Sequence, residues 1–225
     1  MNAKICVSVV GRTFKEIEEM TKLAESEAAD LIEIRFDYLS DKSRPKDIRN
    51  LTSLPLIACN RLSSQGGLFH GKEEDREDKL LAALDAGFDL IDLELETPGL
   101  EKIISLLRRG KARSILSWHS FSPPILEELE LKFSEMKPHR PDICKIVTTA
   151  GAVEDNLTCL NFLSKISQKT ESICFCMGSL GVISRILSPF FGGAFTYAST
   201  RRGREAAPGQ PTVAEVRQIY DLLGV

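Results

Sequence analysis

Short apolar runs alternate with longer amphipathic segments along almost the whole chain. The apolar runs are rich in β-branched residues, which is typical of strands buried on both faces of a parallel sheet. They predict eight strands, over residues 4–10, 31–36, 55–59, 88–95, 112–118, 142–147, 172–177 and 194–198. The amphipathic segments predict eight helices, over residues 14–29, 45–50, 73–86, 99–109, 124–136, 153–168, 181–187 and 212–222.

Strict alternation of strand and helix favours parallel strands joined by helical crossovers. Eight such units fit a closed (β/α)8 TIM barrel, an α/β fold that commonly forms a single domain of this size. We therefore expect one catalytic domain over residues 1–225, without an internal linker. An open doubly wound sheet is the alternative, but no glycine-rich nucleotide-binding motif follows the first predicted strand.

The composition narrows the classes of function. The 225 residues carry a formal net charge of −3, which gives no general attraction to nucleic acid or to an anionic membrane. No apolar run reaches the roughly 18 residues that a membrane span needs, and the first residues show no signal-peptide pattern. The six cysteines lie mostly in strand-like runs without metal-ligand spacing, which indicates reduced thiols in a cytoplasmic protein and no zinc site.

A lysine stands in the middle of the sixth predicted strand. Period-two alternation places Lys145 on the same face as Ile143 and Val147, so in a parallel sheet its ammonium points into protein. Burial disfavours the charged form of a lysine, and a neutral amine is a nucleophile for ketones and aldehydes. The alternative, a lysine near a strand end whose ammonium reaches solvent, is the more common case and stays open from this strand alone.

Polar and charged residues gather at the carboxyl ends of the predicted strands, where (β/α)8 barrels carry their active sites. They are Glu33, Arg35, Asp37, Asn60, Arg61, Asp92, Glu94, His119, Lys145 and Arg185, with Gln210 in the loop after the last strand. Taken singly, each has a structural interpretation, such as an ion pair between Glu33 and Arg35. Their convergence at one end of one barrel favours an active site, because unpaired buried charges are unfavourable.

These residue types suit imine chemistry on a ketone. Lys145 would condense with the carbonyl carbon, and the resulting iminium would make a neighbouring C–H bond acidic. His119, on the adjacent predicted strand, would take that proton and pass it to a departing hydroxyl group. Several arginines favour an anionic, hydroxylated substrate, because guanidinium binds carboxylate as a fork. The scheme requires no metal and no cofactor.

Short motifs in a fixed order give the chain a family resemblance that covers nearly its whole length. They are Ile5-Cys6-Val7-Ser8, Glu33-Ile34-Arg35-Phe36-Asp37, Arg61 with Gly66-Gly67, Asp92-Leu93-Glu94, Ser117-Trp118-His119-Ser120-Phe121, Lys145-Ile146, Met177, Gly181-Val182-Ile183-Ser184-Arg185 and Ala207-Pro208-Gly209-Gln210. With these motifs the chain resembles type I 3-dehydroquinate dehydratase, a hydro-lyase of the shikimate pathway of aromatic amino acid biosynthesis. The resemblance implies a (β/α)8 barrel and syn loss of water from 3-dehydroquinate to give 3-dehydroshikimate.

The resemblance also implies roles for individual residues. Lys145 matches the lysine that forms the Schiff base, and His119 matches the general acid/base. Arg185 matches the arginine that binds the substrate carboxylate, and Gln210 matches a residue that closes over the site from the last loop. The other matched positions are Ser8, Glu33, Arg35 and Arg61, which contact the substrate or order the site, together with Gln65 and Met177 as candidates for catalytic support.

Two positions depart from the family pattern. Gln65 stands four residues after Arg61, where the family usually has a glutamate near the histidine. Imine formation and hydrolysis are therefore expected to be tuned differently in this chain. Ala206 replaces the serine that usually precedes the Ala-Pro-Gly-Gln run, which removes one hydroxyl contact to the substrate.

Two other interpretations stay open at the level of sequence. A class I aldolase also uses a lysine imine on a barrel, although no clear phosphate-binding loop follows strands seven and eight. A catalytically impaired domain of a larger shikimate-pathway protein is favoured by Gln65 and Ala206 but disfavoured by the presence of Lys145 and His119. The expected partner is the small-molecule substrate, while a homodimer and a fusion to or an association with shikimate dehydrogenase stay open.

Overall fold

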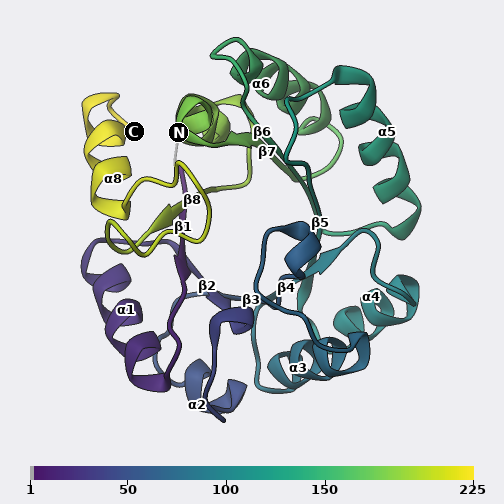
Figure 1. Cartoon of the computed structure of the whole chain (residues 1–225), viewed down its shortest axis with the longest axis vertical. Helices are drawn as coiled ribbons and strands as arrows, with labels where there is room; N and C mark the ends of the chain where they lie inside the picture. Colours follow the sequence, from purple (N-terminus) through teal and green to yellow (C-terminus); the bar gives the residue numbers. More distant parts are fainter. Residues whose placement is uncertain (1–2) are drawn as a thin grey trace.

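The computed structural model describes residues 3–225, in which strands and helices alternate along the chain (Figure 1). The strands are β1 (Ile5–Val9), β2 (Leu31–Arg35), β3 (Leu56–Cys59), β4 (Leu90–Glu94), β5 (Arg113–His119), β6 (Ile143–Thr149), β7 (Ser172–Met177) and β8 (Thr196–Ser199). The helices are α1 (Phe14–Ser26), α2 (Pro45–Arg49), α3 (Glu73–Asp85), α4 (Leu100–Arg109), α5 (Leu126–Met136), α6 (Asp155–Ile166), α7 (Val182–Leu187) and α8 (Val213–Leu222). Every strand and helix predicted from the sequence is present. No helix within residues 3–225 has the length and apolar character to cross a membrane.

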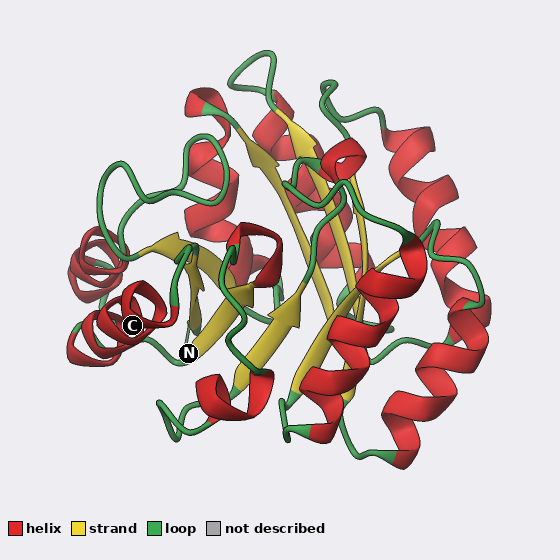
Figure 2. Cartoon of the chain, turned by 60° about the horizontal axis from the view of Figure 1, so that its bottom comes forward, coloured by secondary structure: helices red, strands yellow, loops and turns green. Residues whose placement is uncertain are grey.

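All eight strands pair in parallel, in the order β7-β6-β5-β4-β3-β2-β1-β8. The two ends of this order meet at a parallel bridge between Ser172 and Gly193, where the Ala194 N–H donates to the Ser172 carbonyl at 2.9 Å. The sheet therefore curls into a nearly closed barrel with the helices outside it (Figures 1 and 2). The predicted (β/α)8 barrel is confirmed, and the open doubly wound sheet is wrong.

The ends of the elements follow local backbone chemistry. Thr13 Oγ1 accepts from the Glu16 N–H at 3.3 Å and so caps the start of α1. This helix ends at Ser26, three residues before its predicted end, because Ala28 adopts a φ of +60°, which an α-helix cannot continue. β5, in contrast, runs one residue beyond its predicted end and includes His119. The sheet therefore holds the backbone of this histidine.

The side chains that face the inside of the barrel form two levels. The lower level is apolar and consists of Cys6, Leu31, Ile57, Leu90, Ile115, Ile143 and Ile173. Two residues further along their strands, the inward positions carry polar or charged groups, because side chains alternate between the two faces of a strand. They include Ser8, Glu33, Asp92, Ser117 and Lys145, all of which are buried. The larger apolar core lies between the outside of the sheet and the helices.

Removal of a side chain from the lower level is expected to destabilise the barrel. Ile173 on β7 is fully buried, and truncation of such a residue typically lowers the free energy of unfolding by about 2–5 kcal/mol. We expect this loss for Ile173→Ala in urea denaturation.

Ile183→Ala is the matched control, because Ile183 on α7 is 45% exposed. Its truncation should change the free energy of unfolding by less than about 0.5 kcal/mol. Equal stability of the two variants would contradict the placement of Ile173 in the core.

Candidate active site

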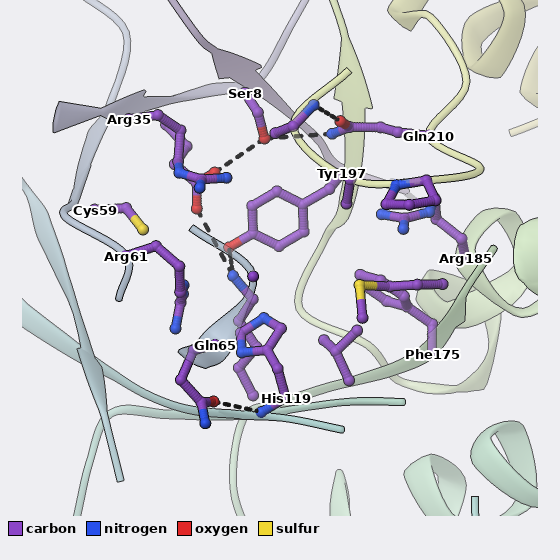
Figure 3. A pocket seen from close by; sticks show the side chains of 18 of the residues that line it. Ser8, Arg35, Cys59, Arg61, Gln65, His119, Phe175, Arg185, Tyr197 and Gln210 are labelled. Carbon is purple, nitrogen blue, oxygen red and sulfur yellow. Dashed lines mark hydrogen bonds and ion pairs between the residues drawn. The ribbon is translucent and has the colours of Figure 1, made fainter. Parts of the chain in front are cut away.

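A pocket opens at the carboxyl ends of the strands, above the apolar level (Figure 3). Its free space, including open solvent at its mouth, is about 570 Å³. The ten candidate residues from the sequence all line it: Ser8, Glu33, Arg35, Arg61, Gln65, His119, Lys145, Met177, Arg185 and Gln210. Closure of the barrel thus brings residues from both ends of the chain into one site.

Lys145 on β6 is 5% exposed, and groups from three other strands hold its ammonium. Nζ donates to Asp92 Oδ2 and to Tyr197 Oη, both at 3.1 Å, and lies 3.7 Å from Glu33 Oε1. It also lies 4.2 Å from the centre of the Tyr197 ring, within the range of a cation–π contact. The lysine is therefore buried and paired, and the alternative of an ammonium in solvent is wrong.

Asp92 is shared between Lys145 and Arg61. Arg61 Nη2 donates to Asp92 Oδ2 at 2.7 Å, and Nη1 donates to Ser117 Oγ at 2.8 Å and lies 3.6 Å from Glu94 Oε1. Burial disfavours the Asp92 carboxylate, but the charges of Arg61 and Lys145 outweigh burial and lower its pKa. Asp92 is therefore an anion between two cations. Arg61 lines the pocket, but protein groups engage much of its guanidinium.

His119 ends β5 and presents its imidazole to the pocket. Its Nδ1 is buried and has no hydrogen-bond partner among the described residues. Burial and the positive charges of the pocket, those of Arg61 and Lys145 first, lower the pKa of His119 well below its ordinary value of 6.5. The imidazole is therefore neutral near pH 7 and is able to accept a proton.

Gln65 contacts the backbone of His119. The His119 N–H donates to Gln65 Oε1 at 3.0 Å (Figure 3). Gln65 ends a short 3-10 turn after β3, and the next residue, Gly66, has a φ of +81°, which glycine adopts without strain. The turn aims the amide at the end of β5. Gln65 therefore fixes the strand end that carries the imidazole.

Arg185 is a pocket guanidinium without a carboxylate partner in the described part of the chain. It extends from α7, is 2% exposed, and leaves Nε and Nη2 without hydrogen bonds. Its guanidinium carbon lies 4.4 Å from the centre of the Phe175 ring. Burial lowers the pKa of Arg185 to about 10, so the group stays charged near pH 7. A buried cation with free donors is suited to bind an anion.

The side of the pocket formed by β1 and β2 carries bonded polar groups. Arg35 forms a two-bond ion pair with Asp37, with distances of 2.9 Å from Nε to Oδ1 and 2.7 Å from Nη2 to Oδ2. Ser8 Oγ donates to Glu33 Oε2 at 2.9 Å and accepts from Gln210 Nε2 at 3.3 Å. Glu33 Oε1 has no hydrogen-bond partner in residues 3–225. The last loop is thus attached to the first strand, beside a carboxylate oxygen that can accept a hydrogen bond.

No role for Asp92 or Tyr197 follows from the sequence, yet both accept a hydrogen bond from Lys145 Nζ. Asp92 is two residues after Leu90, an inward residue of β4, and Tyr197 pairs in register with the inward Cys6 of β1. Period-two alternation was therefore the available signal for both residues. It identifies the inward positions, although it does not identify which of them meet.

A group of potential metal ligands lies in the same pocket. Single ligand atoms of Glu33, Cys59 and Asp92 lie within 4.8 Å of one another. Lys145 and Arg61 already neutralise the two carboxylates. Burial raises the pKa of the Cys59 thiol and so disfavours the thiolate that a metal ion needs. This donor set does not favour a metal ion.

The chain is similar to known proteins in both sequence and structure. A family model described as type I 3-dehydroquinase matches residues 5–225. The 3-dehydroquinate dehydratase of Dehalococcoides mccartyi is 37% identical over 206 residues, which cover 91% of this chain and 91% of that protein. The crystal structure of type I 3-dehydroquinate dehydratase from Clostridium difficile, with covalent modified comenic acid, has a TM-score of 0.88 and 25% identity, covering 98% of this chain and 92% of that one.

The chain is also similar to a solved protein whose name gives two enzyme activities. The dehydroquinate dehydratase and shikimate dehydrogenase of S. pombe AroM has a TM-score of 0.77 and 28% identity, covering 99% of this chain but 44% of that one. The match to the family model extends over nearly the whole barrel, including every residue that lines the pocket. The chain therefore belongs to the type I 3-dehydroquinase family.

Proposed function

We propose that this protein removes water from 3-dehydroquinate to give 3-dehydroshikimate, through an imine on Lys145 and with His119 as general acid and base. Membership of the type I 3-dehydroquinase family supports the hydro-lyase reaction. One observation carries the mechanism: a buried amine shares its pocket with a neutral imidazole and with a guanidinium that lacks a carboxylate partner in residues 3–225. Each of the three groups then has one chemical role.

Arg185 would bind the carboxylate of the substrate. The other arginines of the pocket are balanced locally, because Arg35 pairs with Asp37 and Arg61 pairs with Asp92. A carboxylate beside Arg185 would satisfy its Nε and Nη2 in the fork geometry that guanidinium favours. Binding at this point would fix one end of the substrate relative to the amine.

Ring hydroxyls would be held by the linked side chains of Ser8, Glu33 and Gln210. Glu33 Oε1 supplies a free acceptor, and the Gln210 amide reaches over from the last loop. The Ala206 N–H donates to Gln210 Oε1 at 2.8 Å and so orients this amide. The alanine at position 206 therefore keeps the loop anchored through its backbone, although it offers the substrate no hydroxyl.

The reaction would begin when the Lys145 ammonium passes one proton to His119 and the resulting amine attacks the ketone carbon. His119 would return that proton as the oxygen leaves as water, so that an iminium replaces the ammonium. Asp92 and Glu33 would stabilise this charge as they stabilise the ammonium. His119 would take a proton from the neighbouring carbon, and the electron pair would form an enamine. The electrons would return as the hydroxyl on the next carbon leaves with that proton. Water would then hydrolyse the product iminium and release Lys145.

The two alternative functions have less support. Family membership favours elimination over the carbon–carbon cleavage of an aldolase. An impaired domain is disfavoured because Lys145 and His119 line the same pocket and Gln65 still holds the backbone of the histidine.

We further infer that the protein acts in the cytoplasm, because its six cysteines are free, buried thiols, as is usual in a reducing compartment. The S. pombe protein supports a functional link to shikimate dehydrogenase. A homodimer stays a prediction from the sequence.

Borohydride reduction in the presence of 3-dehydroquinate is expected to attach one ligand to Lys145, because this amine is the one that lines the pocket. Peptide mass mapping locates the label. Lys145→Met should abolish labelling and turnover, whereas Lys165→Met removes an exposed lysine of α6 and should leave both unchanged. Labelling of Lys145→Met at the original level would disprove the assignment.

His119→Ala is expected to lower kcat by about 10²–10⁴-fold, the usual contribution of general acid–base catalysis. Imine trapping should be retained better than turnover, because Lys145 is intact. Absorbance of the enone product and intact mass after reduction measure the two quantities. His139→Ala is the control, since His139 lies in a turn before β6 and outside the pocket. Near-normal turnover of His119→Ala would refute the role of the imidazole.

Gln65→Glu is expected to move the acidic limb of the pH profile to higher pH. The limb reports protonation of His119, whose pKa lies well below 6.5. Glutamate keeps an oxygen for the His119 N–H, and its negative charge favours the imidazolium, so the limb should rise by on the order of one unit.

The measurement is kcat/KM against pH, which reports the free enzyme. Gln168→Glu makes the same charge change at an exposed position after α6 and should leave the profile where it is. An acidic limb that stays in place or moves to lower pH in Gln65→Glu would show that position 65 does not act on the histidine.

A further inference from the structure

We propose that Tyr197 is a catalytic residue of the imine chemistry, which relays a proton between Lys145 Nζ and the oxygen of the carbonyl group that the amine attacks. This inference rests on the function proposed above, and it adds a residue to which that function assigns no role.

The position of Tyr197 brings its hydroxyl to the reacting nitrogen. Tyr197 lies on β8, is 3% exposed, and places Oη 3.1 Å from Lys145 Nζ. Its ring packs against Phe175 and Phe195, with distances between ring centres of 6.3 and 5.4 Å. In Figure 3 the ring stands in the middle of the pocket, among Ser8, Arg185 and His119, which all line it. Contact with these two apolar rings therefore holds the Tyr197 ring in the position in which its hydroxyl meets the amine.

Attack of an amine on a ketone creates a need for such a group. The new C–N bond leaves a positive N–H and a negative oxygen on neighbouring atoms, and a proton must pass from nitrogen to oxygen to give the neutral carbinolamine. A hydroxyl is both a donor and an acceptor. Tyr197 would accept the Nζ proton while it gives its own proton to the oxygen, through a six-membered ring that includes the attacked carbon. The phenol is regenerated, and the same relay in reverse serves imine hydrolysis.

The charges around the site favour a proton relay through the Tyr197 hydroxyl over lasting ionisation of the phenol. Burial first, and then the carboxylate of Glu33, raise the pKa of the Tyr197 phenol well above 10. A free phenolate is therefore disfavoured, but the relay never forms one. Asp92, the other hydrogen-bond partner of Nζ in residues 3–225, is an anion that accepts hydrogen bonds from Arg61 and Lys145 and has no proton to give. Tyr197 is thus the partner of Nζ that can both accept and donate.

The test is the rate at which the imine forms. Protein and 3-dehydroquinate are mixed for increasing times, the reaction is stopped with borohydride, and the fraction carrying one ligand is read by intact mass. Tyr197→Phe removes only the hydroxyl and keeps the ring against its neighbours. We expect the saturating rate of adduct formation to fall by about 10–100-fold, the lower part of the range for general acid–base catalysis. The substrate concentration at half saturation should stay within about twofold, because the relay acts after binding.

Tyr220→Phe is the matched control. Tyr220 on α8 is also buried, but its hydroxyl donates to the Ile186 carbonyl at 2.8 Å and lies outside the pocket. Its loss should lower the melting temperature and leave the rate of adduct formation unchanged.

The outcomes separate this inference from the function on which it rests. A saturating rate for Tyr197→Phe within twofold of the original protein would overturn the relay and leave the Lys145 imine intact. A loss of rate shared equally by Tyr220→Phe, or a change confined to the half-saturating concentration, would also overturn it. Absence of any adduct in the original protein would overturn the proposed function and the relay together. This outcome is seen with the original protein alone, so it cannot be confused with an effect of Tyr197→Phe.

Discussion

The pocket depends on one interaction, the buried ion pair between Lys145 and Asp92. Neither charge is exposed, so each must be paired within the protein, and Asp92 is paired a second time by Arg61. Removal of Asp92 would leave Lys145 and Arg61 as buried cations without the carboxylate that they share. The register of the sheet contributes to this pairing, because Asp92 on β4 lies opposite Ile115 on β5, and Ile115 lies opposite Ile143, two residues before Lys145 on β6. A shift in strand register would therefore also separate the charged groups of the pocket.

The arrangement of charges also explains how the pocket could stabilise a buried iminium on Lys145. The carboxylates of Asp92 and Glu33 lie beside Nζ before any substrate binds. An iminium on the same nitrogen would meet the same carboxylates, so little reorganisation would be needed when it forms. Arg185, whose guanidinium lies over the Phe175 ring, stays outside this balance and keeps its donors for an anion. A neutral imidazole between such cations remains a base at low pH.

Much of this could be predicted from the sequence. The barrel follows from the alternation of strands and helices, and period two places Lys145 on the inward face of its strand, while the polar residues at the other strand ends favoured its place in an active site. The partners of Lys145 could not be predicted in this way. Asp92 and Tyr197 lie 53 and 52 positions away, and their contact depends on the register and tilt of separate strands. The contact between the Gln65 amide and the backbone of His119 could not be predicted either, because it depends on the conformation of the turn after β3. The sequence likewise does not show that Arg185 has free hydrogen-bond donors, because this depends on which residues surround it in the fold.

The hydrogen bond from Gln210 to Ser8 spans 202 positions of the chain. A contact of such large sequence separation must overcome the entropy of closing a long loop. A partly folded chain can therefore contain β2 to β6, with the lysine and the histidine already on neighbouring strands, and still have an open pocket. The site becomes complete only when the first strand meets the last loop. The substrate-binding side formed by Ser8 and Gln210 therefore depends on contact between the two ends of the chain.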